Sequence, residues 1–297
     1  MVNIGFIGAG NMGLPMLTNL VEAGHIVTAF DLSKGALNAA SLAGAKIGSS
    51  LESAVTGNDV IITMLPAGKQ VKAAYLGESG VISMADSNAI LIDCSTIDVT
   101  TAREVCDKAS QRGLDMIDAP VSGGVAGAAA GTLTFMVGGT QESFDRAKSM
   151  LDPMAKTVVY AGPSGNGQAA KICNNMMLAA GMIVTSEAFC LADKLGLDRT
   201  TMFEIVSQAT GQCWALTNYC PAPGPLPSSP ANNGYKPGFT AAMMDKDLKL
   251  ANNVAKETGA NTPIGAVAAE LYDNFCSDGN GDLDFSAIFL KIIQEEK

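Results

Sequence analysis

The segment with the clearest chemical potential is a glycine-rich stretch near the N-terminus, Gly8-Ala9-Gly10-Asn11-Met12-Gly13. It follows an apolar run that predicts a strand, and it opens an amphipathic stretch that predicts a helix. In this setting the first glycine permits a tight turn and the second lets the backbone approach a pyrophosphate. The third lets the helix pack closely on the sheet. Free N–H groups at the start of the helix would then bind the phosphates.

Asp31 follows the next predicted strand, Ile26–Phe30. A carboxylate there accepts hydrogen bonds from the ribose hydroxyls of a dinucleotide and repels a 2′-phosphate. We therefore predict NAD rather than NADP, with Lys34 as the residue that could instead accommodate a phosphate.

Two later strand ends are placed to line the same crevice, because ligands of open α/β sheets bind beyond the carboxyl ends of strands. Ordinary strand-end turns would look the same in sequence. The residues predicted to bind the cofactor on these grounds are Gly8, Gly10, Asn11, Met12, Gly13, Asp31, Leu65, Pro66 and Thr96.

Lys171 is the candidate for the acid–base step that a nicotinamide enzyme needs when it oxidises an alcohol. Helical spacing places Gly167, Lys171, Asn174 and Asn175 on one stripe of a predicted helix. Gly167 would leave room for a ligand, and Asn175 could orient the ammonium group or bind substrate. On spacing alone, a surface lysine with an extended aliphatic stem is the simpler interpretation.

A third motif, Asp118-Ala119-Pro120-Val121-Ser122-Gly123-Gly124, follows another predicted strand. A hydroxyl beside two exposed glycine N–H groups suits a carboxylate. A flexible loop without a ligand is the alternative.

Other chemistries are excluded. The single histidine, His25, lies in a predicted surface turn, and it rules out a multi-histidine metal site. We predict no bound metal. The stretch 278–289 lacks the glycine and glutamate of a calcium loop, so we predict a helix-entry loop capped near Asp284. Ser122 has neither the flanking motif nor the histidine of a serine hydrolase.

The elements that must position these residues alternate between β-rich and helical segments over the first half of the chain. This alternation predicts a mostly parallel, doubly wound α/β sheet, with mixed pairing at its later end. The predicted strands are Val2–Gly8, Ile26–Phe30, Asp59–Leu65, Ala89–Cys94, Leu114–Asp118, Leu133–Val137 and Val158–Ala161.

The second half predicts helices only, beginning with a long one at Ala169–Leu195 that Gly196 closes. We place the domain boundary between residues 163 and 164, with domains 1–163 and 164–297. The loop between Gly211 and Gly238 is long enough to indicate a functional segment facing substrate or a second subunit. The further predicted helices are Arg199–Ala209, Thr240–Thr258, Pro263–Cys276 and Phe285–Glu296.

The 297 residues are 47% hydrophobic and 16% charged, with a net charge of −10. This balance argues against nucleic acid or an anionic membrane as the main partner. Seven scattered cysteines without a CxxC pair predict reduced, buried thiols. No basic leader precedes the first strand, and the longest apolar run is far too short to span a membrane, so we expect a cytoplasmic protein.

Taken together, these motifs resemble the β-hydroxyacid dehydrogenase family over essentially the whole chain. The segments that carry the resemblance are 8–20 (GAGNMGLPMLTNL), 118–139 (DAPVSGGVAGAAAGTLTFMVGG), 165–175 (GNGQAAKICNN) and 244–251 (MDKDLKLA). The resemblance implies a Rossmann domain, an all-helical second domain joined by the long helix, a site in the cleft between them, and a homo-oligomer.

The resemblance also implies residue roles. Lys171 is the catalytic residue, Asn175 supports substrate, and Lys246 lies near the nicotinamide. The residues that would bind substrate are Ser122, Gly123, Gly124, Asn175, Trp214, Phe239 and Asp247. Leu17 departs from the residue usual in the family at a position that affects helix packing. Cys213 departs from the usual residue at a position in the substrate pocket.

Within the family, the segments 213–224 and 229–235 most resemble members that oxidise 3-hydroxyisobutyrate to methylmalonate semialdehyde, a step of valine breakdown. The pocket motifs are shared, so L-serine, tartronate semialdehyde and succinic semialdehyde remain alternative substrates. A non-catalytic NAD-binding module is the alternative of another class.

Overall fold

The computed structural model describes residues 1–294. The chain divides into two compact units, Met1–Lys171 and Ile172–Lys297. The predicted helix end at Glu295 and Glu296 lies outside the described residues. The boundary that we predicted between residues 163 and 164 stays a prediction.

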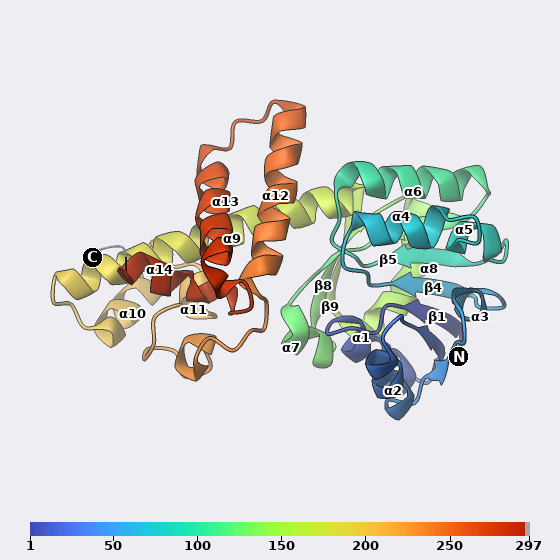
Figure 1. The fold of residues 1–297 in the computed structure, drawn as a ribbon, viewed down its shortest axis with the longest axis horizontal. Coiled ribbons are helices and arrows are strands. Elements are labelled where there is room, and N and C mark those ends of the chain that lie inside the picture. Colours follow the sequence, from blue (N-terminus) through green and yellow to red (C-terminus); the bar gives the residue numbers. More distant parts are fainter. Residues whose placement is uncertain (295–297) are drawn as a thin grey trace. The chain divides into compact units, whose positions relative to one another are not determined.

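The first unit is built on a nine-stranded sheet flanked by helices (Figure 1). Its strands run in the order β3-β2-β1-β4-β5-β6-β8-β7, with β9 paired to β8. The strands are β1 (Asn3–Ile7), β2 (Ile26–Phe30), β3 (Lys46–Ile47), β4 (Val60–Thr63), β5 (Ile90–Asp93), β6 (Asp115–Asp118), β7 (Val121–Ser122), β8 (Leu133–Gly138) and β9 (Ala155–Gly162).

Every pair among the first six strands is parallel. The chain moves outward from β1 to β3 and then returns to β4 on the other side of β1, which makes the carboxyl ends of β1 and β4 the switch point of a doubly wound sheet. The later end is mixed, because β8 pairs antiparallel with β6 and β7 but parallel with β9. The predicted α/β fold class is confirmed.

Two strands, β3 and β7, were missing from the sequence prediction. Each is two residues long, so neither carries an alternating pattern that could be recognised. Both form because a longer neighbouring strand supplies hydrogen-bond partners: β2 for β3, and β8 for β7.

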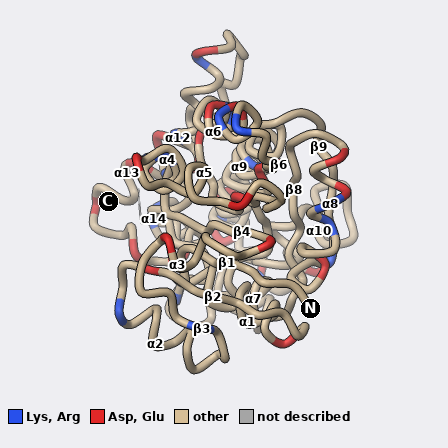
Figure 2. The backbone as a smooth tube through the Cα atoms, turned by 90° about the vertical axis from the view of Figure 1, so that its right-hand side faces the viewer, with Lys and Arg blue, Asp and Glu red and all other residues tan. Residues whose placement is uncertain are grey.

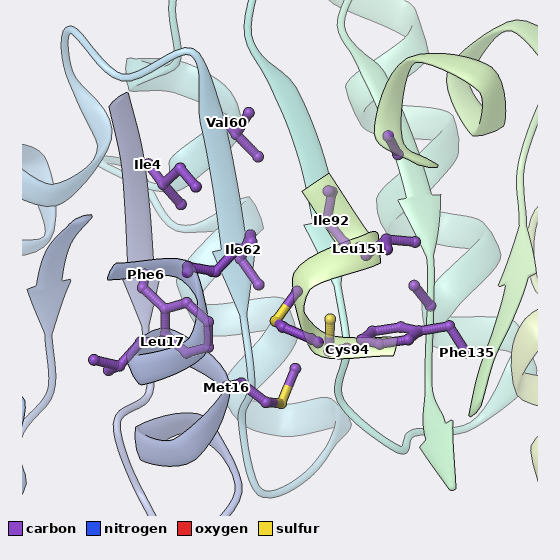
Figure 3. Packing of buried hydrophobic residues seen from close by; sticks show 14 of the residues in the cluster. Ile4, Phe6, Met16, Leu17, Val60, Ile62, Ile92, Cys94, Phe135 and Leu151 are labelled. Atoms are coloured by element: carbon purple, nitrogen blue, oxygen red, sulfur yellow. The ribbon is translucent and has the colours of Figure 1, made fainter. Parts of the chain in front are cut away.

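Helices cover both faces of this sheet, and each face has its own core. Ile4, Phe6 and Ile62 pack with Met16 and Leu17 of α1 on one face (Figure 3). Strands buried on both faces read as continuous apolar runs, which explains why they were recognisable. The helices of this unit are α1 (Gly13–Glu22), α2 (Lys34–Leu42), α3 (Leu51–Val55), α4 (Gly68–Leu76), α5 (Val81–Met84), α6 (Val99–Gln111), α7 (Gly124–Ala129) and α8 (Gln141–Leu151).

The second unit contains most of the long helix α9 (Asn166–Lys194) and, within its described residues, only helices and loops. Gly196, at φ 73°, follows α9 as predicted. The predicted long loop contains two short helical turns, α11 (Trp214–Thr217) and η2 (Pro230–Asn233). The remaining helices are α10 (Arg199–Ser207), α12 (Ala241–Thr258), α13 (Pro263–Phe275), η3 (Cys276–Asn280), η4 (Phe285–Ala287) and α14 (Ile288–Gln294).

The charged residues are scattered in short segments along the tube rather than gathered by sign (Figure 2). Strands β1, β2, β4 and β8 carry none.

Within residues 1–294, α9 is the one helix whose length and composition would let it cross a membrane. Core helices of globular proteins pass the same test, and α9 contributes Ala179, Met182 and Phe189 to the helical core.

All seven cysteines are free, but the prediction that they are buried was wrong for four of them. Cys173, on α9, is exposed. Cys190, Cys213 and Cys276 are half-buried.

Candidate active site

The glycine loop occupies the carboxyl end of β1, at the switch point of the sheet. Gly8 has φ 95°, and its N–H donates to Phe30 O. A Cβ on Gly13 would lie 1.9 Å from Gly8 O, so α1 can approach β1 this closely only with glycine there. A Cβ on Gly10 would meet no protein atom within 4 Å. Gly10 therefore faces open space at the start of α1, which is the arrangement that a pyrophosphate requires.

Asp31 holds this loop against the end of β2. Its Oδ2 accepts a hydrogen bond from Ala9 N at 2.8 Å, and its Oδ1 accepts one from Ser33 N at 2.7 Å. The carboxylate is half-buried, and each oxygen has a further lone pair that can accept from a ribose hydroxyl. The residues present thus fit a dinucleotide.

Ser95 and Asp93 fix the ends of β4 and β5. Ser95 Oγ accepts from Leu65 N at 2.8 Å and donates to Asp93 Oδ1 at 2.6 Å. Thr63 Oγ1 donates to the same carboxylate oxygen at 2.7 Å. Burial raises the pKa of Asp93 to about 6, against the lowering effect of these hydrogen bonds. The network sets the path of the backbone at Leu65, which the sequence had placed beside the cofactor.

Gln168 and Asp118 connect these strand ends to the start of α9. The Gln168 side chain is fully buried; its Nε2 donates to Ser95 O at 2.7 Å and its Oε1 accepts from Ile97 N at 3.1 Å. Asp118 accepts from Gly165 N at 2.7 Å and from Gln168 N at 2.9 Å. Sequence reasoning missed Gln168, Asp93 and Ser95. The position of Gln168 inside the segment 165–175 was the available signal.

Gly167 has another role than the one expected from the sequence. Its missing side chain does not leave room for a ligand, because a Cβ would lie 2.4 Å from Met136 O and 2.7 Å from Asp118 O. Glycine is required here so that α9 can start against the backbone of β6 and β8.

The Ser122 segment forms a turn with unusual backbone geometry. Ser122 pairs with Thr134 across β7 and β8, so its position is set by the sheet and not by a flexible loop. Gly123 and Gly124 follow with φ of 134° and 64°. Glycine is favoured at both positions because other residues rarely adopt such φ values. The role of their N–H groups in holding a carboxylate stays a prediction.

Lys171 and Asn175 lie one turn apart on α9, and both are buried, with 7% and 1% of their surface exposed. The surface-lysine interpretation of Lys171 is therefore wrong. Asn175 Nδ2 donates to Asp247 Oδ2 at 2.6 Å, and its Oδ1 accepts from Asn174 Nδ2 at 2.9 Å. These bonds hold the Asn175 amide in one orientation.

The Oδ1 atom of Asp247 is buried and has no hydrogen-bond partner among the described residues. It lies 3.4 Å from Lys246 Nζ. Asp247 is 3% exposed. A buried oxygen of this kind is costly unless a ligand or a cation satisfies it. The predicted residues Asn175, Lys246 and Asp247 are thus brought together within the second unit.

Trp214 and Phe239 belong to an aromatic cluster in the same unit. Trp214 stacks on Tyr219, with ring centroids 5.1 Å apart, and Tyr219 stacks on Phe285 at 5.3 Å. Phe239 meets the edge of Phe285 at 5.7 Å. Tyr219 and Phe285 were not predicted as site residues. Among the described residues, no group of three or more His, Cys, Asp or Glu side chains could hold a metal ion.

Two family models match the chain. Residues 3–162 match the NAD binding domain of 6-phosphogluconate dehydrogenase, and residues 165–292 match the NAD-binding domain of NADP-dependent 3-hydroxyisobutyrate dehydrogenase. The fold and this site define an NAD-dependent oxidoreductase.

Individual proteins extend the similarity over the whole chain. A probable 3-hydroxyisobutyrate dehydrogenase of Mycobacterium tuberculosis is 50% identical over 97% of both chains. An NAD-dependent L-serine dehydrogenase of Pseudomonas aeruginosa is 44% identical over the same shares. The solved structure of M. tuberculosis 3-hydroxyisobutyrate dehydrogenase with L-serine covers 98% of this chain and 99% of its own, with 49% identity and a TM-score of 0.94. The chain belongs to the β-hydroxyacid dehydrogenase family, as its motifs predicted.

Proposed function

We propose that this protein catalyses the reversible, NAD-dependent oxidation of 3-hydroxyisobutyrate to methylmalonate semialdehyde, a step of valine breakdown. The observation that carries this proposal is the 50% identity to a probable 3-hydroxyisobutyrate dehydrogenase over 97% of both chains. The buried Lys171 supports it, because an alcohol oxidation needs a positioned acid–base group.

In the proposed mechanism, Lys171 takes the proton of the substrate hydroxyl. NAD, when bound, would accept the hydride from the carbon that bears this hydroxyl. Ser122 and the N–H groups of Gly123 and Gly124 hold the substrate carboxylate, which fixes the distance between the reacting carbon and the cofactor. Asn175, oriented by Asp247, donates to or accepts from the substrate.

The residues proposed for the cofactor follow from the glycine loop and the strand ends. Gly8, Gly10, Asn11, Met12 and Gly13 form the loop that receives the pyrophosphate, and Asp31 binds the adenosine ribose. Leu65, Pro66 and Thr96 line the cofactor crevice, and Lys246 lies near the nicotinamide. Trp214, Phe239 and Asp247 complete the substrate residues.

L-Serine is the second candidate substrate, and the 44% identity to an NAD-dependent L-serine dehydrogenase favours it. The two acids share the primary hydroxyl and the carboxylate. They differ at C2, where one carries a methyl group and the other an ammonium group. An apolar wall, as proposed for Trp214 and Phe239, favours 3-hydroxyisobutyrate. A carboxylate oxygen free to meet the ammonium group favours serine, and Asp247 Oδ1 supports serine to the extent that Lys246 Nζ, 3.4 Å away, does not already neutralise it.

Initial rates of NADH formation with 3-hydroxyisobutyrate and L-serine, each repeated with NADP, test the substrate and cofactor assignments. We expect 3-hydroxyisobutyrate with NAD to give the highest kcat/KM. A higher kcat/KM for serine would overturn the substrate assignment, and a preference for NADP would overturn the role of Asp31.

Lys171→Ala tests the mechanism. Loss of a general base predicts a fall in kcat of about 100-fold or more, while calorimetric titration shows unchanged NAD affinity. The matched control is Lys156→Ala, which removes an exposed lysine from β9 of the same unit. Wild-type activity in Lys171→Ala would refute the assignment.

We further propose a homo-oligomer, supported by an exposed apolar face on α9. Met177, Val184 and Leu191 are 72%, 58% and 61% exposed, and their spacing puts them on one side of the helix; Leu195, 76% exposed, follows directly after its end. Such a face suits contact with a second copy. Sedimentation velocity tests this: a purely monomeric wild-type protein would contradict it.

We also propose a cytoplasmic location, because seven free thiols suit a reducing compartment.

A further inference from the structure

Asp284 is a fully buried carboxylate that joins three separate segments of the second unit. Its Oδ2 accepts hydrogen bonds from Tyr219 Oη at 2.9 Å, from Gly238 N at 3.0 Å and from Phe239 N at 3.3 Å. Its Oδ1 accepts from Ser286 N at 3.0 Å and Ser286 Oγ at 2.7 Å. A buried charge with five donors is a strong and directional anchor.

The segments joined in this way carry the aromatic cluster. Tyr219 lies between Trp214 and Phe285, with interplanar angles of 19° and 26°. Its hydroxyl reaches past the stack to Asp284. A Cβ on Gly238 would lie 3.0 Å from that hydroxyl, so the chain passes close to it. The position of the Trp214 ring thus depends on Tyr219, and the position of Tyr219 depends on Asp284.

The backbone at Asp284 and Phe285 also holds the C-terminal end of this loop. Asp284 N donates to Tyr235 O at 2.9 Å, and Phe285 N donates to Phe239 O at 2.9 Å. Tyr235, at φ 55°, is the one non-glycine residue with a positive φ in the described part of the chain. A residue adopts this conformation only where its surroundings enforce it.

Tyr219 is a permanent donor in this arrangement. Burial and the adjacent Asp284 carboxylate both raise the pKa of the Tyr219 hydroxyl far above its ordinary value. The hydroxyl therefore stays protonated near neutral pH and keeps its hydrogen bond to Asp284.

We propose that Asp284 is a positioning residue for substrate recognition, which acts by holding Tyr219 and the Gly238-Phe239 backbone so that Trp214 and Phe239 form a fixed apolar wall. This inference rests on the proposed function, which assigns Trp214 and Phe239 to the substrate. The proposal places this wall against C2 of the substrate, where 3-hydroxyisobutyrate and L-serine differ, so that Asp284 contributes to the discrimination between the two acids without touching either.

Tyr219→Phe tests the proposal with the smallest change, because it keeps the stacked ring and removes only the donor to Asp284. Asp284→Asn is the second variant, since the amide keeps one acceptor and offers a donor where the carboxylate accepts. Tyr272→Phe is the matched control: the Tyr272 hydroxyl is fully buried in the same core, but it donates to Phe285 O at 2.9 Å and not to the loop.

Two readouts separate positioning from general stability. Trp214 is the only tryptophan of the chain, so intrinsic fluorescence reports on the stack alone. Steady-state kinetics give KM and kcat for each acid and for NAD.

We expect Tyr219→Phe to shift the Trp214 emission and to raise KM for 3-hydroxyisobutyrate by about threefold to tenfold, the equivalent of one hydrogen bond. The preference over L-serine falls, while KM for NAD and kcat stay within about twofold. Asp284→Asn changes both readouts in the same direction, and Tyr272→Phe changes neither. If Asp284→Asn does not fold, Tyr219→Phe decides.

An unchanged emission in Tyr219→Phe, or a shifted emission with an unchanged KM and an unchanged preference, would overturn the proposal. Equal effects in Tyr272→Phe would also overturn it, because they would show a general loss of packing. The proposed function fails separately, if the wild-type protein oxidises neither acid; the proposed role of Asp284 in substrate recognition then fails with it, and the emission of Tyr219→Phe still decides whether Asp284 holds the stack.

Discussion

The Asp118 carboxylate accepts a hydrogen bond from the backbone N–H of Gln168, 2.9 Å away in the first turn of α9. Its second oxygen accepts from Gly165 N. The carboxyl end of β6 therefore determines where α9 begins, and Lys171 follows Gln168 by just under one helical turn. Because the strand is buried on both sides, this anchor is rigid, and Lys171, the proposed catalytic residue, has little freedom so close to it.

Asp118→Asn is expected to lower kcat by more than its loss of stability alone would explain. The amide presents a donor to one of the two N–H groups, which costs about 1–3 kcal/mol of the free energy of unfolding and loosens the first turn of α9. We expect kcat to fall about tenfold or more while KM for NAD is unchanged. Urea denaturation and steady-state kinetics measure the two effects.

The control for this variant is Thr140→Val, which removes the N-cap hydrogen bond of α8, from Ser143 N to Thr140 Oγ1 at 3.0 Å. It should cost about 1 kcal/mol and leave kcat intact. If Asp118→Asn lost only stability, as the control does, the positioning role of Asp118 would be wrong.

The two glycines of the cofactor loop should respond in opposite ways to the same substitution. A Cβ on Gly10 meets no protein atom within 4 Å, whereas one on Gly13 lies 1.9 Å from Gly8 O. Gly10→Ala should therefore change the free energy of unfolding by less than about 1 kcal/mol and weaken NAD binding about tenfold or more. Gly13→Ala should destabilise the fold by about 1–3 kcal/mol. Urea denaturation and calorimetric titration with NAD measure both.

Each glycine variant serves as the control for the other. Full NAD affinity in Gly10→Ala would show that the open space beside Gly10 is not used by the cofactor. A fully stable Gly13→Ala would contradict the close approach of α1 to β1.

The raised pKa of Asp93 predicts that the stability of the fold depends on pH. Burial raises the pKa of Asp93 in the folded protein to about 6, above the ordinary value of about 3.9. Between these values the folded protein holds a proton that the unfolded chain has released. The contribution of Asp93 to stability is therefore present at low pH and is lost as the pH rises toward 6 and through it.

Asp93→Asn removes this titration. The amide oxygen can still accept the hydrogen bonds that Thr63 Oγ1 and Ser95 Oγ donate to Asp93 Oδ1. The urea midpoint of the wild-type protein should fall relative to that of Asp93→Asn between about pH 4 and about pH 6, and the two should run parallel above about pH 7. Parallel profiles for the two proteins would contradict the raised pKa.

Much of the site was visible in the sequence because the signals are local. The glycine loop, Asp31 and the Ser122-Gly123-Gly124 turn each combine a strand end with residues that only such a turn requires. The long helix was recognisable from its apolar length and from Gly196 at its end. The short strands β3 and β7 carried no such signal, and their pairing partners created them.

The sequence by itself determined the doubly wound fold, the preference for a dinucleotide and the family, because alternating apolar runs and glycine spacing depend on neighbours a few residues apart. Only the tertiary structure decided that Lys171 is buried, that Asn175 is held by Asp247, and that Asp284 anchors Tyr219. Asn175 and Asp247 are 72 residues apart, and Tyr219 and Asp284 are 65 apart. Hydrogen bonds over such separations form only after the helices have packed, so no local pattern encodes them.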